Sequence, residues 1–185
     1  GGTTVGQVYF YHNTFSTSTS ENTTAISDAG GGQASNMHFR NNIFVGGKGT
    51  SGPINAPIGV TDVTTNDMNY DMLDSTSAAT RLVVWAATSY SVHNFGGPAA
   101  TLETTRNWER NGVRGHAVFQ DSSMNKWNYK LQSTSAAKDA GMRITGVNTG
   151  IGGARYKTLP DAGCFEYGWP PNTTLTWWKR LFYRP

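Results

Sequence analysis

The stretch Val8-Tyr9-Phe10-Tyr11-His12-Asn13-Thr14-Phe15 returns 29 residues later as Met37-His38-Phe39-Arg40-Asn41-Asn42-Ile43-Phe44. Large apolar residues occupy matching places in the two copies, and both copies carry an asparagine at the sixth position. Apolar and polar residues alternate with the period of a β-strand that has one buried face. A repeat of this length is typical of solenoid proteins. We expect a third, weaker copy over residues 66–70, with Asn69 placed 27 residues after Asn42.

The repeat predicts how these strands are arranged. Neither strand can bury its apolar face alone, so one copy is expected to stack on the next. Copies that run in the same direction, joined by about twenty residues of loop, form a parallel β-helix. Asn13 and Asn42 would then stack at an inward turn and bond to backbone and to each other, as identical residues do along parallel strands. The alternative is a β-sandwich in which two antiparallel strands happen to resemble each other.

Composition supports a β protein rich in turns. Of the 185 residues only 15% are charged and 22 are glycine, which is unlike a helical domain. The net charge of +3 is too small to indicate a nucleic-acid partner. A lone cysteine, Cys164, excludes an internal disulfide and is most simply a small core residue. The sequence contains no apolar run of about 18 residues, so no membrane-spanning helix is predicted.

The first residues of the chain and its two sequons bear on where the protein acts. The chain begins with Gly-Gly, so we expect a processed product or a piece of a longer protein. Sequons at Asn22 and Asn172 agree with secretion, although such triplets also arise by chance in a Thr-rich chain. We therefore expect an extracellular or cell-surface protein.

Four segments follow from the pattern of the chain. Residues 1–75 are expected to form the coils, 76–117 an insertion with a short helix, 118–168 a closing region, and 169–185 an aromatic and basic tail. The helix is predicted over 101–111, with Thr101 as its cap, Leu102 and Trp108 on its apolar side, and Gly112 at its end. Strands are predicted over 82–85 and 128–131.

Motifs in the last third of the chain resemble a known family. They are Asp121-Ser122-Ser123-Met124, Asn128-Tyr129-Lys130-Leu131-Gln132, Ser135-Ala136-Ala137-Lys138-Asp139-Ala140-Gly141 and Pro160-Asp161-Ala162-Gly163-Cys164-Phe165-Glu166-Tyr167. Their order and spacing resemble the carboxy-terminal end of right-handed parallel β-helix proteins of the pectate-lyase-like superfamily. The sequence departs from that pattern at Ser122, Met124, Asn128 and Ala136. The resemblance implies an all-β fold: a right-handed parallel β-helix of few coils, with an irregular C-terminal closing region and one short helix.

The resemblance implies no single activity. Its members include polysaccharide lyases, glycoside hydrolases and surface or adhesion proteins, and fold alone does not settle chemistry. The active groove of the enzymes usually lies on coils before the closing region, and most of those coils are absent here. No catalytic residue of the family can therefore be assigned by motif, and the catalytic residues stay unknown.

Outward-facing side chains of the repeat suggest a glycan-contact site. If Phe10 and Phe39 point inward, the residues that point outward are Tyr9, Tyr11, His38 and Arg40. An aromatic ring can stack on a sugar ring, and an arginine can bind a carboxylate with two hydrogen bonds. His38 or Tyr11 could act as the base of a lyase. The simpler alternative is a solvated strand face with ordinary cross-strand pairs.

Acidic residues give weaker signals. Asp67, Asn69 and Asp71 alternate like the opening of a calcium loop, but the expected glycine is Met72 and the expected glutamate position is Ala78. A polar strand face explains them more simply, so no cofactor or metal is expected. Glu103 and Glu109 are interpreted as surface charges rather than as a glycosidase pair.

The first coil is expected to need a partner. Exposed strand edges attract other strands, and Gly1 to Gln7 offers no helix to cover Val8, Phe10 and Asn13. We predict that preceding coils or a copy of the same chain cover this edge, and that copies could stack into a filament. The tail residues Trp177, Trp178 and Phe182 are expected to pack on the same chain or a neighbour rather than on a membrane surface.

Two hypotheses of function follow. The first is an extracellular β-helix module, structural or glycan-contacting, that assembles through its open coil end. The second is the C-terminal part of a polysaccharide lyase or glycoside hydrolase that acts on an acidic polysaccharide. The first is favoured because no complete acid and base arrangement is evident in the sequence.

Overall fold

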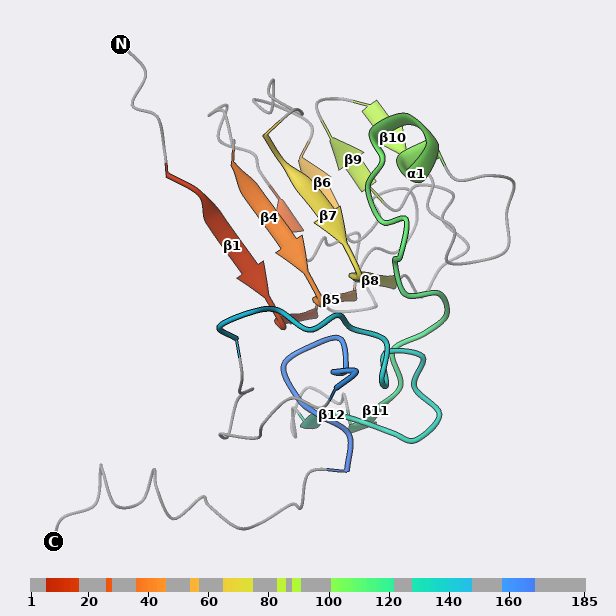
Figure 1. Ribbon diagram of the computed structural model, residues 1–185. Helices are drawn as coiled ribbons and strands as arrows, with labels where there is room; N and C mark the ends of the chain where they lie inside the picture. Colours follow the sequence, from red (N-terminus) through yellow and green to blue (C-terminus); the bar gives the residue numbers. More distant parts are fainter. Residues whose placement is uncertain are drawn as a thin grey trace, which may run out of the picture.

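The computed structural model describes residues 6–16, 26–27, 36–45, 54–56, 65–74, 83–85, 88–90, 101–121, 128–147 and 158–168. This part of the chain is mostly β with one short helix (Figure 1). The strands are β1 (Val8–Tyr11), β2 (Thr14–Ser16), β3 (Ile26–Ser27), β4 (Met37–Arg40), β5 (Ile43–Val45), β6 (Ile54–Ala56), β7 (Asp67–Asn69), β8 (Met72–Asp74), β9 (Val83–Trp85), β10 (Thr88–Tyr90), β11 (Phe119–Asp121) and β12 (Asn128–Leu131), and the helix is α1 (Thr101–Arg106).

Parallel strands are grouped into three sheets. The orders are β1-β4-β7, β2-β5-β8 and β3-β6-β9, and β10 joins the last sheet antiparallel to β9. Each pass of the chain adds one strand to each sheet, so β1, β4 and β7 lie side by side and point the same way (Figure 1). Phe10 pairs with Phe39, and Phe39 pairs with Met68. The predicted parallel pairing of the two matching stretches is confirmed, and the antiparallel alternative is wrong for these strands.

Stacked aromatic rings form the core between the first two sheets. The rings of Phe10 and Phe39 stack with centroids 4.7 Å apart, and those of Phe15 and Phe44 stack at 5.0 Å. Phe39 meets Phe44 edge to face at 6.0 Å, which joins the two sheets. The inward direction predicted for Phe10 and Phe39 is therefore confirmed. Other buried members of this core are Met68, Leu73, Val83, Tyr90, Leu102 and Trp108.

A tight turn separates the first-sheet strand from the second-sheet strand in each pass. His12, Asn41 and Tyr70 occupy this turn at 29-residue intervals, and all three have a left-handed backbone, with φ of 53°, 59° and 61°. Asparagine and histidine adopt that conformation more readily than most residues. The recurrence shows that the repeat keeps its period through the third copy.

The residue after each turn belongs to a ladder of side-chain hydrogen bonds. The backbone N–H and Nδ2 of Asn13 both donate to Oδ1 of Asn42, each at 3.0 Å. The same two groups of Asn42 both donate to Oδ1 of Asp71, each at 2.7 Å. The third copy expected over residues 66–70 does lie beside the second, as β7, but Asn69 is not the counterpart of Asn42: Asp71 takes that place, and Asn69 pairs with Arg40.

Helix α1 is shorter than predicted. It ends at Arg106 because Asn107 adopts a left-handed conformation (φ 61°), a common way to end a helix. Gly112 therefore does not end it. Among the described residues, no helix has the length and apolarity needed to cross a membrane.

The segment after α1 returns along the last coil (Figure 1). The backbone N–H of Glu109 donates to the carbonyl of Met68 at 2.8 Å, and that of Val113 donates to the carbonyl of Asp71 at 2.9 Å. Val113 also forms a parallel bridge with Met72. Residues 108–113 therefore cover the edge formed by β7 and β8. Glu109 is only 4% exposed, so its interpretation as a surface charge is wrong.

Residues 113–121, 128–147 and 158–167 contribute to a second layer on the outside of the β2-β5-β8 sheet. Ile43, Val45 and Met72 face away from the aromatic core and pack in a second core. Their buried partners from the later segment are Val113, Leu131, Ala137 and Ala162. The closing region therefore packs on the side of the coils, whereas the end of the last coil is covered by residues 108–113.

Asn41 fastens this second layer to the coils. Its Nδ2 donates to the carbonyl of Met142 at 2.6 Å, and its Oδ1 accepts the N–H of Met142 at 2.8 Å. The N–H of Gly163 donates to the Asn41 carbonyl at 2.7 Å. Gly163 has φ of 93°, and a Cβ there would lie 2.7 Å from Ile43 and 2.8 Å from Thr14. Only glycine fits this contact without strain.

Candidate functional site

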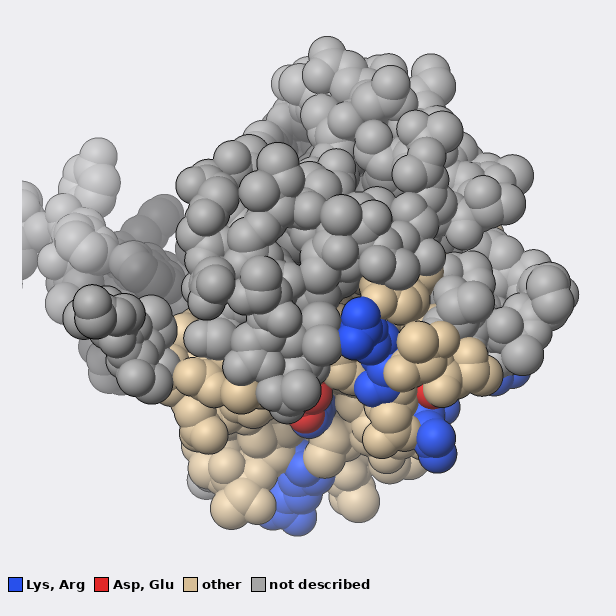
Figure 2. Space-filling view, turned by 90° about the horizontal axis from the view of Figure 1, so that it is seen from above, with Lys and Arg blue, Asp and Glu red and all other residues tan. Residues whose placement is uncertain are grey.

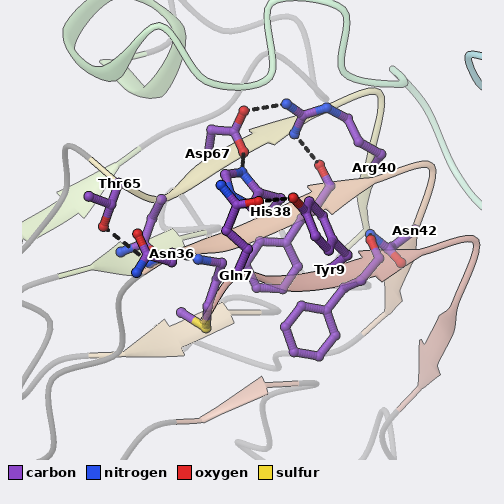
Figure 3. A network of polar contacts seen from close by, with 12 residues as sticks. Gln7, Tyr9, Asn36, His38, Arg40, Asn42, Thr65 and Asp67 are labelled. Carbon is purple, nitrogen blue, oxygen red and sulfur yellow. Dashed lines mark hydrogen bonds and ion pairs between the residues drawn. The ribbon is translucent and has the colours of Figure 1, made fainter. Parts of the chain in front are cut away.

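The outer face of the β1-β4-β7 sheet carries the predicted glycan-contact residues. Because side chains alternate along a strand, an inward Phe10 and Phe39 place their neighbours outside. Tyr9 is paired with His38, and Tyr11 with Arg40, as the repeat predicted. The Tyr9 and His38 rings stack with centroids 5.0 Å apart (Figure 3). Tyr9 is 51% exposed, so its ring remains accessible on this face.

Asp67 joins His38 and Arg40 into one polar network (Figure 3). Oδ1 of Asp67 lies 2.6 Å from Nδ1 of His38, and Oδ2 accepts a hydrogen bond from Arg40. Burial alone would raise the pKa of Asp67, but the bonds from Arg40 and His38 outweigh it and lower that pKa. Sequence reasoning missed this role. The 29-residue period could have found it, because Asp67 lies one period after His38.

Tyr11 is poorly suited to act as a base. Burial, followed by the nearby Tyr9, raises its pKa above the ordinary value of 10.0. The phenol therefore keeps its proton at neutral pH and acts as a hydrogen-bond donor. His38 is better placed, since Asp67 fixes one of its ring nitrogens and leaves the other as the candidate base.

The three residues considered as calcium ligands each contact different partners. Asp67 binds His38 and Arg40, whereas Asp71 lies buried in the ladder. Oδ1 of Asn69 accepts the backbone N–H of Asn111 at 2.9 Å. Within the described ranges, no three His, Cys, Asp or Glu side chains are grouped as metal ligands. These contacts give the calcium hypothesis no support, and it stays a prediction.

A polar pocket of about 400 Å³ opens at one end of this face. It is lined by Arg40, Asn66, Asp67, Met68, Asn69, Arg106, Asn107 and Trp108. Nε of Arg106 donates to the Tyr90 hydroxyl at 2.7 Å, and its guanidinium lies 5.3 Å from the centre of that ring. Viewed from above, Lys and Arg side chains lie close to acidic ones in the described part of the surface (Figure 2). No pattern in the sequence indicates this pocket, because α1 is brought to β7 by the tertiary fold.

A buried carboxyl pair, also missed by sequence reasoning, ends the side-chain ladder. Oε2 of Glu109 accepts the backbone N–H of Asp71 at 3.1 Å. Burial raises the pKa of Asp71 to about 7. Burial, together with the charge of Asp71, raises the pKa of Glu109 well above its ordinary value. Asp71 Oδ2 and Glu109 Oε1 are buried and have no hydrogen-bond partner. They gain one if one carboxyl group keeps its proton and donates it to the other. A proton held between the two carboxyl groups would satisfy both oxygens, and burial, which raises the pKa of each group, favours that arrangement.

The predicted assembly residues fall into two groups. Val8, Phe10 and Asn13 lie on or beside β1, which is the outermost strand of its sheet. Asn13 Oδ1 accepts no hydrogen bond from any described residue, whereas Asn42 Oδ1 accepts two. The other candidates, in the tail, lie outside the described residues: Trp177, Trp178 and Phe182.

Comparisons of this chain with protein-family models, with curated proteins and with solved structures found no match.

Proposed function

We propose that this chain is a right-handed parallel β-helix module that binds an acidic polysaccharide at the cell surface or outside the cell. Support for the fold comes from the three sheets of parallel strands, to which each pass of the chain adds one strand. The ladder of Asn13, Asn42 and Asp71 further supports it, because like positions superpose at a constant spacing.

The exposed Tyr9 and His38 stack beside Arg40 is the observation that carries the glycan-binding proposal. A sugar ring can lie on the Tyr9 ring, while neighbouring polar groups bind its hydroxyl and carboxylate groups. Parallel strands place successive outward side chains about 4.8 Å apart. The face is thus an extended surface suited to a chain of sugars rather than a closed cavity for one small molecule.

Replacing Tyr9 with alanine is expected to weaken binding of an acidic polysaccharide by about fivefold, since a stacked aromatic contact contributes about 1 kcal/mol. Calorimetric titration with oligogalacturonate measures the effect. Leu159→Ala is the matched control, because Leu159 is also exposed, at 60%. Equal affinities for both variants and the unchanged chain would count against this face as the binding site.

A lyase or hydrolase role is the second candidate, and the contact between His38 and Asp67 favours it. A carboxylate that fixes one imidazole nitrogen can prepare the other to take a proton. Under that proposal, incubation with oligogalacturonate releases shorter products: a lyase leaves unsaturated sugars, which absorb in the ultraviolet, and a hydrolase leaves new reducing ends. His38→Gln should abolish the signal. Without any product from the unchanged chain, the binding role alone is retained.

We also propose assembly through the open β1 edge, with preceding coils or a copy of the chain as the partner. Asn13 Oδ1 and the stacking faces of Phe10 and Phe15 would be used by a further coil as Asn42, Phe39 and Phe44 are used by the first. Light scattering is expected to show a mass that rises with concentration above 20.0 kDa. Asn13→Ala should reduce that rise. A constant monomer mass at all concentrations would contradict self-assembly.

A further inference from the structure

The pocket beside the outer face differs from the rest of that face in its charge. Its two arginines come from different elements, Arg40 from β4 and Arg106 from the end of α1. Asp67 binds Arg40 and so compensates its charge. Arg106 contacts the neutral Tyr90, and no carboxylate pairs with it in the described part of the chain. Within the described residues, Arg106 therefore gives the pocket a positive charge that no carboxylate compensates.

The structure also fixes the orientation of Arg106. Tyr90 is only 3% exposed, so its hydroxyl is a firmly held acceptor for Nε of Arg106. The ring of Tyr90 also lies against the guanidinium. With Nε bonded to Tyr90, the two terminal nitrogens remain for a ligand. A planar guanidinium held in this way is preorganised to bind an oxyanion with two parallel hydrogen bonds.

Neutral groups around Arg106 suit the rest of a sugar. Asn66, Asn69, Asn107 and Trp108 line the same pocket. Oδ1 of Asn66 and Oδ1 of Asn69 already accept backbone N–H groups, so the amide nitrogens are the groups that a sugar would meet. Amide nitrogens donate hydrogen bonds, which sugar hydroxyls accept. A volume of about 400 Å³ lies within the range typical of small-ligand sites.

We propose that this pocket is a subsite for one anionic substituent, a carboxylate or a sulfate group, on a sugar bound to the outer face. Arg106 binds the anion through its terminal N–H groups, and Tyr90 is a positioning residue. The proposal rests on the proposed function, because Arg40 and Asp67 belong to both the face and the pocket. The subsite adds a second wall, formed by α1, where Arg106 distinguishes charged from uncharged sugars.

The test compares ligands that differ only in charge. Calorimetric titration of the full chain would use oligogalacturonate and its methyl ester, then a sulfated galactan and its desulfated form. Arg106→Gln should weaken binding of the preferred charged ligand about tenfold or more, the expected loss for a charge-assisted hydrogen bond. Binding of its uncharged counterpart should not change. The charged ligand that responds identifies the anion as carboxylate or sulfate.

Matched variants separate charge from structure. Arg114→Gln makes the same change at an exposed position outside the pocket and should leave all affinities unchanged. Arg106→Lys should retain part of the affinity, because the charge remains. Tyr90→Phe should weaken binding of the charged ligand less than Arg106→Gln does, since it removes only the acceptor for Nε. Thermal unfolding of each variant reports whether the fold is preserved.

Failure of the subsite can be told apart from failure of the function. If the chain binds oligogalacturonate and Tyr9→Ala weakens it, but Arg106→Gln behaves as Arg114→Gln, the subsite is overturned and the binding face stands. If Arg106→Gln weakens charged and uncharged ligands equally, Arg106 has no anion-selective role and the subsite is again overturned. If no acidic glycan binds the unchanged chain, both proposals fail.

Discussion

Asn42→Ala is expected to lower the free energy of unfolding by about 4 kcal/mol, because it leaves several buried groups without partners. Asn42 is fully buried. Its Oδ1 accepts two hydrogen bonds from Asn13, and its Nδ2 donates to the Phe10 carbonyl and to Asp71. Alanine removes all four bonds and cannot supply replacements. Urea unfolding followed by circular dichroism measures the change.

Asn128→Ala provides the comparison. Asn128 lies in β12, and its side chain makes two long bonds of 3.3 Å, one from its Nδ2 to Gln120 and one from the Lys130 N–H to its Oδ1. Its replacement should change the free energy of unfolding by about 0.5 kcal/mol or less. A similar small loss for Asn42→Ala would mean that the ladder does not hold the coils together.

Asp71→Asn is expected to stabilise the protein at pH 8 and to flatten its pH dependence. The unfolded Asp71 carboxyl loses its proton near pH 4, whereas the folded one, with a pKa of about 7, keeps it over the next 3 pH units or so. The folded state thus binds more protons than the unfolded state in that window, so stability falls as pH rises. From pH 5 to pH 8 the loss should be about 3 kcal/mol. Glu109, with its pKa also raised, acts in the same direction.

Asparagine at position 71 removes that loss without breaking the ladder. Its Oδ1 still accepts the two bonds from Asn42, and its Nδ2 can donate to Glu109. Urea unfolding of the two proteins at pH 5 and pH 8 gives the comparison. The contribution of His12 to stability has the opposite pH dependence. Burial lowers the pKa of His12 to about 4, so its contribution to the free energy of unfolding increases as pH rises from 4 to about 6.5. His12 is present in both proteins, so its contribution cancels in their difference.

Glu109→Gln is the matched variant, because it removes the other carboxyl of the same pair. It should flatten the pH profile in the same way and keep an acceptor for the Asp71 N–H. If neither variant changes the difference in stability between pH 5 and pH 8, the two carboxyl groups do not share a proton.

The repeat was predictable because its signal is local. Phe10 and Phe39 carry the strand alternation in their own neighbourhoods, and one offset relates them, so direction and register followed from the sequence. The third copy lies where it was expected, but its register was off by two residues, because Asn69 was matched to Asn42 by residue type rather than by position. Asp71 accepts the same bonds as an asparagine would, and Asn69 lies two residues too early.

The candidate site was only partly predictable, because its missing members arrive through long-range contacts. Glu109 lies in a segment with a helical pattern, and nothing near it in sequence shows that it is buried beside Asp71, 38 residues away. Arg106 reaches the pocket only because α1 packs against the coils. Asn41 bonds to Met142 across 101 residues, a contact that no local pattern encodes.

The side-chain ladder has a direction, and that direction makes its two ends unequal. Every rung donates toward the following rung, from Asn13 to Asn42 and from Asn42 to Asp71. Among the described residues, the leading end thus has an acceptor, Asn13 Oδ1, that no group uses, while at the trailing end the Glu109 carboxylate already occupies the place where the next rung would sit. Under the proposed assembly, a further coil can therefore add at the leading end alone, because the chain already covers its own trailing end.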